Sequence, residues 1–154
     1  MKSMSINKKN EPALPTKKRK IVVIDDNELF LGTLKNILVD KGYEVTICLD
    51  ATGARHIFSL ENFDAVISDI SLGGKVSGID LLQEFKKIRN VPVILVTGFA
   101  ELAERNDVIA KGADGFFEKP FRKEELFQVL GKCFGEKKIV VKDINLDNDY
   151  SGLG

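Results

Sequence analysis

The chain has 154 residues, no formal net charge at pH 7, 44% hydrophobic and 30% charged residues, values typical of one folded domain that buries its own core. Its two cysteines, Cys48 and Cys133, are too far apart in sequence for a CxxC motif, which excludes a disulfide framework or a cysteine-rich metal site and predicts two small core or boundary residues. No stretch approaches the roughly 20 apolar residues that span a bilayer, and the N-terminus has no apolar signal segment, so we expect a cytoplasmic protein without a membrane segment.

The charges are distributed unevenly along the chain. Residues 1–20 carry seven basic side chains and one acidic side chain, whereas residues 136–154 carry three basic and four acidic ones. Residues 1–18 are polar, include two prolines and show no apolar periodicity, which predicts a disordered basic arm. We expect this arm to be a solvated tail, and salt-sensitive binding to nucleic acid or to an acidic surface is the alternative.

From Lys20 onward, short apolar runs alternate with segments of helical length. The runs are rich in Val, Ile and Phe and predict five strands, at residues 21–24, 43–47, 64–68, 91–96 and 115–117. Apolar residues recur with helical spacing between the strands, most clearly over residues 30–41 before a stop at Gly42, and less cleanly in the segments that start near residues 79 and 122. A further helix is expected around residues 101–110, where Asn106 and Asp107 are poor helix formers and favour a movable segment. This alternation predicts an α/β fold, a doubly wound five-stranded parallel sheet with helices on both faces.

The segment after the last predicted helix, residues 136–154, is too short for a second domain. Its apolar residues 139–141 predict a small extra strand or a segment that docks on the body, and the final dozen residues are expected to be loose. No helix-turn-helix can be fitted there, so we expect no DNA-binding domain.

Polar side chains follow four of the predicted strands. Asp25 and Asp26 follow the first strand, Asp69 follows the third, and the fourth and fifth are followed by Thr97 and Lys119. Because ligands bind beyond the carboxyl ends of the strands in an open parallel sheet, we expect these groups to converge on one edge.

Three ionised carboxylates at one edge oppose folding. At about 4 Å and an effective dielectric constant of about 20, each pair repels by roughly 4 kcal/mol, and Lys119 offsets only part of this repulsion. The site should therefore take up a proton or bind a cation, and oxygen ligands with room for water fit Mg²⁺. A metal ion, an ammonium and a hydroxyl also stabilise a transferring phosphoryl group, and a carboxylate can accept that group as an aspartyl phosphate.

Four stretches, IVVIDDN, DAVISDI, VPVILVTG and KGADGFFEKPF, together resemble the receiver domain of bacterial two-component response regulators. The resemblance covers roughly residues 19–135 and implies a flavodoxin-like sheet with strand order 2-1-3-4-5. It implies that Asp69 is the phosphoacceptor. It further implies that Asp25 and Asp26 hold Mg²⁺, with Asp69 and the backbone carbonyl of Ser71 as additional ligands.

The same resemblance assigns roles to residues of the last two strands. It implies that Thr97 is the switch hydroxyl, that Lys119 pairs with the phosphate, and that a cis peptide bond precedes Pro120. Phe116 stands at the position of the switch aromatic residue and, lacking a hydroxyl, is expected to favour an inward position. The loop SLGGKVSG after Asp69 lacks the usual proline of the family and has one extra residue, which predicts a more mobile loop.

The resemblance implies a single-domain response regulator. It would accept a phosphoryl group on Asp69 from a histidine kinase or a phosphotransfer protein and would then bind a downstream protein through its fourth helix, fifth strand and fifth helix. Such a switch is no enzyme beyond slow self-phosphorylation and self-dephosphorylation. The alternatives are a receiver domain excised from a larger regulator or hybrid kinase, a constitutive interaction module and, least favoured, an aspartyl-nucleophile phosphatase. The single histidine, His56, follows no predicted strand and is expected to be a surface or boundary residue.

Overall fold

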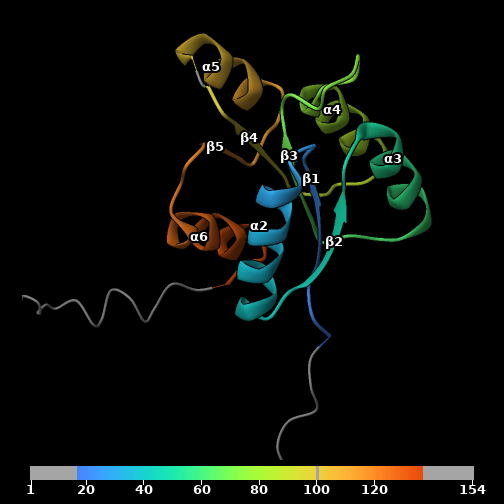
Figure 1. The fold of residues 1–154 in the computed structure, drawn as a ribbon, viewed down its shortest axis with the longest axis vertical. Helices are drawn as coiled ribbons and strands as arrows, with labels where there is room; N and C mark the ends of the chain where they lie inside the picture. The colour runs from blue at the N-terminus through green and yellow to red at the C-terminus, as the bar shows by residue number, and fades with distance from the viewer. Residues whose placement is uncertain (1–16, 100, 137–154) are drawn as a thin grey trace, which may run out of the picture.

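Strands and helices alternate along the whole of the described chain, which in this computed structural model comprises residues 17–99 and 101–136 (Figure 1). The elements are β1 (Lys20–Ile24), α2 (Glu28–Lys41), β2 (Glu44–Cys48), α3 (Ala51–Leu60), β3 (Ala65–Asp69), α4 (Gly78–Ile88), β4 (Val93–Thr97), α5 (Leu102–Ala110), β5 (Gly115–Glu118) and α6 (Lys123–Cys133). The expected basic arm and C-terminal extension lie almost entirely outside the described residues.

The strands form one parallel sheet with the order β2-β1-β3-β4-β5, which confirms the predicted topology. Each predicted strand lies within two residues of the observed one, and the apolar runs differ chiefly in that β3 and β4 extend to Asp69 and Thr97. Strand β1 pairs with β3 so that Ile24 lies opposite Ser68. This register brings the residues directly after β1 beside the last residue of β3.

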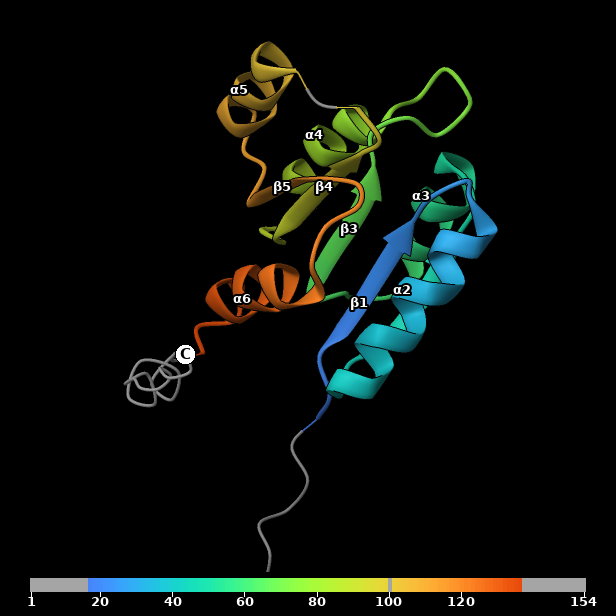
Figure 2. The ribbon, with the colours of Figure 1, turned by 60° about the vertical axis from the view of Figure 1, so that its left-hand side comes forward.

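Helices cover both faces of the sheet (Figure 2). Leu31, Leu34 and Leu38 of α2 share a core with Leu126 and Leu130 of α6 on one face. The other face packs against α3, α4 and α5. Strands β1, β3 and β4 are buried throughout except at Lys20, because side chains on both of their faces meet a helix layer. Burying one such aliphatic side chain contributes about 1.5–3 kcal/mol, so these central strands give the site a rigid support.

Local sequence signals set the ends of the helix that follows β1. Asn27 is the N-cap of α2, and its side chain accepts a hydrogen bond from the backbone N–H of Phe30 at 3.0 Å. The helix ends at Gly42, which has a φ of 111° and confirms the predicted stop. The acidic pair Asp25 and Asp26 therefore lies in the short connection between a buried strand and a capped helix.

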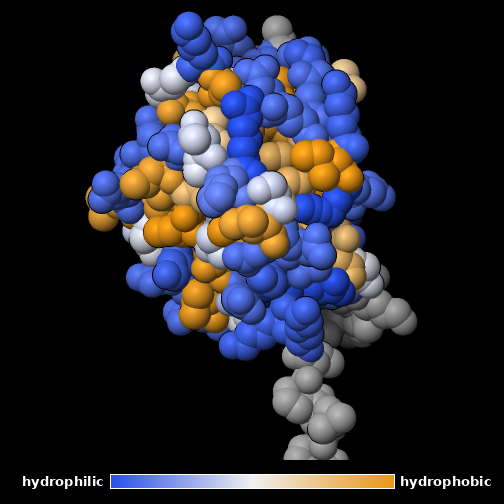
Figure 3. All heavy atoms as spheres, turned by 90° about the vertical axis from the view of Figure 1, so that its right-hand side faces the viewer, coloured by the Kyte–Doolittle hydropathy of each residue, from blue (hydrophilic) through white to orange (hydrophobic). Residues whose placement is uncertain are grey.

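The surface of the described residues is predominantly hydrophilic. On the face that carries β2 and α3, apolar residues form separate patches among polar ones (Figure 3). Among the described residues, no helix has the length and apolar character required to cross a membrane. Cys48 and Cys133 are half-buried free thiols, as expected for boundary residues, and His56 is exposed.

Candidate functional site

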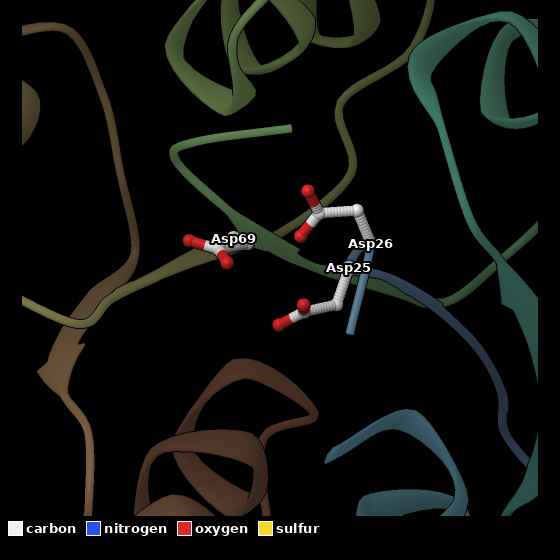
Figure 4. Close-up of side chains that lie close together, drawn as sticks. All are labelled: Asp25, Asp26 and Asp69. Atoms are coloured by element: carbon white, nitrogen blue, oxygen red, sulfur yellow. The ribbon is translucent and has the colours of Figure 1, made fainter. Parts of the chain in front are cut away.

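Three carboxylates from the ends of β1 and β3 meet at one edge of the sheet (Figure 4). Asp25 is 1% exposed and Asp69 is 8% exposed, whereas Asp26 is open to solvent. Each offers an oxygen atom, and these three oxygens lie within 4.8 Å of one another. The convergence expected from the sequence is therefore observed, and it follows from the pairing of β1 with β3.

Lys119, directly after β5, reaches two of these carboxylates. Its Nζ atom lies 2.7 Å from Oδ2 of Asp25 and 3.3 Å from Oδ2 of Asp69. Its backbone N–H donates to the carbonyl oxygen of Thr97 at 2.8 Å, which fixes the start of the side chain beside β4. The peptide bond from Lys119 to Pro120 is cis, as the family resemblance implied.

Burial and neighbouring charge act together on the two ionisable groups at the centre of the site. Burial raises the pKa of Asp69, and the charge of Asp25 raises it further, against the opposing effects of Lys119 and of a hydrogen bond from the N–H of Ser71. Burial lowers the pKa of Lys119, but its hydrogen bonds and attraction to Asp25 and Asp69 outweigh this, so that the pKa is raised. Lys119 therefore stays charged. Its one positive charge lies beside three carboxylates, so it cannot neutralise all of them.

The donor set fits a hard divalent cation. Carboxylate oxygens are the ligands that Mg²⁺ prefers, and exposed Asp26 leaves a side open for the water molecules that Mg²⁺ retains. Ser71, two residues beyond Asp69, donates its backbone N–H to Oδ1 of Asp69 at 3.2 Å. The structure thus places Ser71 beside the carboxylates.

The loop between β3 and α4 lies against both the core and the acidic cluster. Leu72 is buried with 6% exposure and belongs to the core beneath α4. Gly73 has a φ of 79°, and a Cβ atom added there would lie 3.0 Å from Oδ2 of Asp26. Leu72 and Gly73 thus bring this loop against the core and the acidic cluster, and its greater mobility stays a prediction.

The close approach of Gly78 to β3 yields a stability prediction. A Cβ atom at Gly78 would overlap the backbone carbonyl oxygen of Asp69 and lie 3.0 Å from Cα of Ile70. Gly78→Ala is therefore expected to lower the free energy of unfolding by about 1–3 kcal/mol, since neither backbone group can move without disturbing the core. Denaturant unfolding measures this, with Gly74→Ala as the control because an added Cβ there meets nothing within 4 Å. Equal stability of the two variants would contradict the close contact.

Thr97 lies at the same edge of the sheet, but its hydroxyl group bonds to its own loop. The Oγ1 atom donates to the carbonyl oxygen of Phe99 at 3.0 Å and accepts from the N–H of Phe99 at 3.2 Å. The hydroxyl predicted as part of the cluster therefore bonds to neither Asp69 nor Lys119 in this structure. Phe99 itself is 70% exposed.

Phe116 occupies the inward position expected for it. Its side chain is 7% exposed and belongs to the core between the sheet and α3, α4 and α5. The guanidinium group of Arg105 on α5 lies 4.8 Å from the centre of the Phe116 ring. Val108 of α5 is buried in the same core, and the N-cap of this helix, Glu101, makes no side-chain capping bond. The N-terminus of α5 therefore lacks the stabilisation that a capping side chain gives.

Two residues beside the site were not singled out from the sequence. Asn27, the N-cap of α2, also donates its backbone N–H to Oδ1 of Asp25 at 2.8 Å, and an Asn before a helical segment is a signal that could have identified it. Phe30 was assigned only to the apolar face of α2, yet its ring centre lies 4.0 Å from Nζ of Lys119. No spacing rule predicts this contact, because it joins residues far apart in sequence.

Comparison with known proteins agrees with this geometry. Residues 21–131 match the family described as the response regulator receiver domain. The chain is 35% identical over 109 residues to the protein named "Probable transcriptional regulator ycf27" of Cyanophora paradoxa, which covers 71% of this chain and 45% of that protein. It is 31% identical over 106 residues to Protein PetR of Rhodobacter capsulatus, covering 69% and 44%. The chain thus spans less than half the length of these relatives.

Solved structures of receiver domains share the fold. A response regulator receiver domain from Clostridium thermocellum aligns with a TM-score of 0.71 and 32% identity, over 76% of this chain and 94% of that one. A response regulator from Burkholderia pseudomallei, solved with a phosphorylated aspartic acid and a calcium ion, aligns with a TM-score of 0.68 and 30% identity, over 73% and 66%. With its parallel sheet, its acidic cluster and this family match, the chain belongs to the receiver domains of two-component response regulators.

Proposed function

We propose that Asp69 is the phosphoacceptor of a phosphorylation switch, and that it receives its phosphoryl group from a histidine kinase or a phosphotransfer protein. One observation carries the proposal: the carboxylate of Asp69, at the end of a buried strand, lies beside the ammonium of Lys119 and within reach of two further carboxylates. An oxygen nucleophile, a fixed cation and a set of metal ligands are the parts that phosphoryl transfer requires.

Asp69 acts as the nucleophile in this proposal. One of its carboxylate oxygens attacks the phosphorus atom, the P–N bond to the donor histidine breaks, and the bonding electrons remain on the imidazole nitrogen. Lys119 pairs with an oxygen of the incoming group, which requires its ammonium to exchange part of its present bond to Asp69. Asn27 and Lys119 keep the carboxylate of Asp25 in place during this exchange.

Asp25, Asp26 and Asp69, with the backbone carbonyl of Ser71, would hold Mg²⁺. When bound, the ion neutralises negative charge that develops on the phosphoryl oxygens. The presence of three carboxylates beside one ammonium supports this assignment, because a further cation offsets both the burial of Asp69 and its repulsion by Asp25, which together raise the pKa of Asp69.

The added charge of about −1.5 to −2 on Asp69 is expected to draw the hydroxyl of Thr97 away from Phe99 and toward the phosphoryl group. Thr97 and Phe116 are thus the proposed switch residues, and α5, β5 and α6 form the face that binds a downstream protein. The N-terminus of α5, where Glu101 makes no side-chain capping bond, supports a rearrangement there. We propose that this signalling takes place in the cytoplasm, without DNA binding by the receiver unit itself and without a role as an enzyme beyond slow self-reaction.

A single-domain regulator and a receiver unit of a larger regulator would use the same chemistry. The curated relatives are more than twice as long as the matched region, and this favours the second arrangement. The site residues proposed above are the same in both.

A phosphodonor assay tests the proposed function. The wild-type chain, incubated with Mg²⁺ and a small phosphodonor such as acetyl phosphate, is expected to gain the mass of one phosphoryl group, and Asp69→Asn is expected to gain none. Asp40→Asn, at an exposed position of α2, serves as the control and should be labelled like the wild type. Equal labelling of Asp69→Asn and the wild type would overturn the assignment.

A further inference from the structure

The ring of Phe30 lies against the ammonium of Lys119, in addition to the two carboxylates that this ammonium binds. The Nζ atom is 4.0 Å from the ring centre, 2.7 Å from Asp25 and 3.3 Å from Asp69. A cation at this distance from the face of an aromatic ring is attracted by the negative potential of the ring. Groups from α2, β3 and the end of β1 therefore fix the place of one ammonium.

The ring of Phe30 is itself held in place from two directions. Its backbone N–H is bound by the side chain of Asn27, so the first turn of α2 is fixed beside the site. Phe121 meets the ring edge-on, with the ring centres 6.1 Å apart, and Phe121 in turn packs against Phe117 of β5 at 5.2 Å. The segment that carries Lys119 therefore also supports the ring that covers its ammonium.

Phe30 packs at the margin of the core beneath α2 and α6, and the contact of its ring with the ammonium is additional to this packing. Phe30 is half-buried and borders a groove of about 140 Å³. The groove is lined by apolar and small side chains together with one lysine: Thr33, Leu34, Ile37, Pro120, Phe121 and Lys123. A leucine would keep apolar contact with this core, although it is smaller than phenylalanine, but it would offer no ring face to the ammonium.

We propose that Phe30 is a positioning residue for phosphoryl transfer to Asp69, an inference that rests on the proposed function. The lysine side chain is long and flexible, so its ammonium can occupy many positions when nothing restrains it. The ring of Phe30 keeps the ammonium beside Asp69 and excludes water from one of its sides. An incoming phosphoryl group therefore meets a cation that is already beside Asp69 and that needs only to exchange part of its bond to this carboxylate, which favours the transition state.

Replacing the ring of Phe30 by an apolar side chain that has no ring tests the inference. In the full 154-residue chain at saturating Mg²⁺, Phe30→Leu is expected to slow labelling by acetyl phosphate by about threefold to tenfold, the range of a partly exposed cation–π contact. Phe30→Tyr keeps the ring face and should label at nearly the wild-type rate. Phe127→Leu is the matched control. The ring of Phe127 on α6 also contacts an ammonium, that of Lys41 at 5.0 Å, but Lys41 is the last residue of α2 and lies at the opposite end of this helix from the acidic cluster.

Two further measurements separate positioning from a loss of structure. The dissociation constant for Mg²⁺ should be unchanged in Phe30→Leu, because the proposed contact acts on the ammonium and not on the carboxylates. In a Lys119→Met background, Phe30→Leu should cause no additional slowing, because the ammonium that the ring positions is gone.

The outcomes distinguish this inference from the function on which it rests. Wild-type labelling with an unchanged rate in Phe30→Leu would overturn the inference alone. Equal slowing by Phe30→Leu in the wild-type and Lys119→Met backgrounds would do the same, as would a weakened Mg²⁺ affinity that accounts for the slower rate. Failure of the wild type to be labelled at Asp69 would instead overturn the proposed function.

Discussion

Asp26→Asn is expected to weaken Mg²⁺ binding by about 10–100-fold and to slow phosphorylation of Asp69 at low Mg²⁺ concentration by a similar factor. The physical reason is the loss of one of three charges that face the cation, at the residue that leaves the cluster open to water. Asp26 is exposed, so removing its charge should not lower the free energy of unfolding. A calorimetric titration with Mg²⁺ measures the affinity directly.

The same substitution separates a metal ligand from a general effect of charge. Asp40→Asn removes one negative charge from an exposed position of α2 and is expected to leave the affinity within a factor of about two. At saturating Mg²⁺, Asp26→Asn should recover most of the wild-type labelling rate, because Asp25, Asp69 and Lys119 are intact. An unchanged affinity in Asp26→Asn would show that Mg²⁺, if bound, is held elsewhere.

The sheet could be predicted from the sequence because its signals are local and repeated. Apolar runs alternate with helical periodicity, and a parallel sheet with helices on both faces is the arrangement that buries such runs. The convergence of Asp25, Asp26 and Asp69 followed from the same argument, since the carboxyl ends of neighbouring parallel strands meet at one edge. The ends of β3 and β4 were placed too early because Asp69 and Thr97 are polar, although both are almost fully buried.

The side-chain contacts around the site could not be predicted from these local signals. The ring of Phe30 against Lys119, and the guanidinium of Arg105 against Phe116, join residues whose contact depends on helix placement to within a few ångströms. The hydrogen bonds of Thr97 to Phe99 depend on the conformation of a single loop. Periodicity specifies which face of a helix is buried, but not the rotamers at its ends.

Asp69→Asn is expected to stabilise the metal-free protein at neutral pH, although it removes the proposed phosphoacceptor. Asp69 is 8% exposed beside buried Asp25, and burial together with this neighbouring charge raises its pKa above the ordinary value of 3.8. At neutral pH, folding therefore buries the ionised carboxylate of Asp69 beside a second negative charge, which lowers the free energy of unfolding. An amide of the same shape removes the repulsion, so the variant is expected to have the higher free energy of unfolding, by an amount that the lost attraction to Lys119 reduces.

The dependence of this gain on pH follows from the direction of the shift. Because the pKa of Asp69 is higher in the folded than in the unfolded state, the folded state binds more protons, and wild-type stability falls relative to the variant as pH rises through this interval. The two proteins should be equally stable below the ordinary pKa of 3.8, where the carboxyl is protonated in both states, and the full difference should be present above the raised value. Denaturant unfolding with a chelator, at several pH values, measures it.

Mg²⁺ should reverse the order of stability of these two proteins. A ligand at about 100 times its dissociation constant stabilises the folded state by about 2.7 kcal/mol, and the wild type, with three carboxylates, binds the ion more tightly than Asp69→Asn. Wild-type stability should therefore rise above that of the variant at saturating Mg²⁺. A wild type that is more stable than the variant without metal, or one that gains nothing from Mg²⁺, would show that Lys119 already balances the charge of the three carboxylates. The three carboxylates would then be stable together beside Lys119 alone, without Mg²⁺ as a second cation.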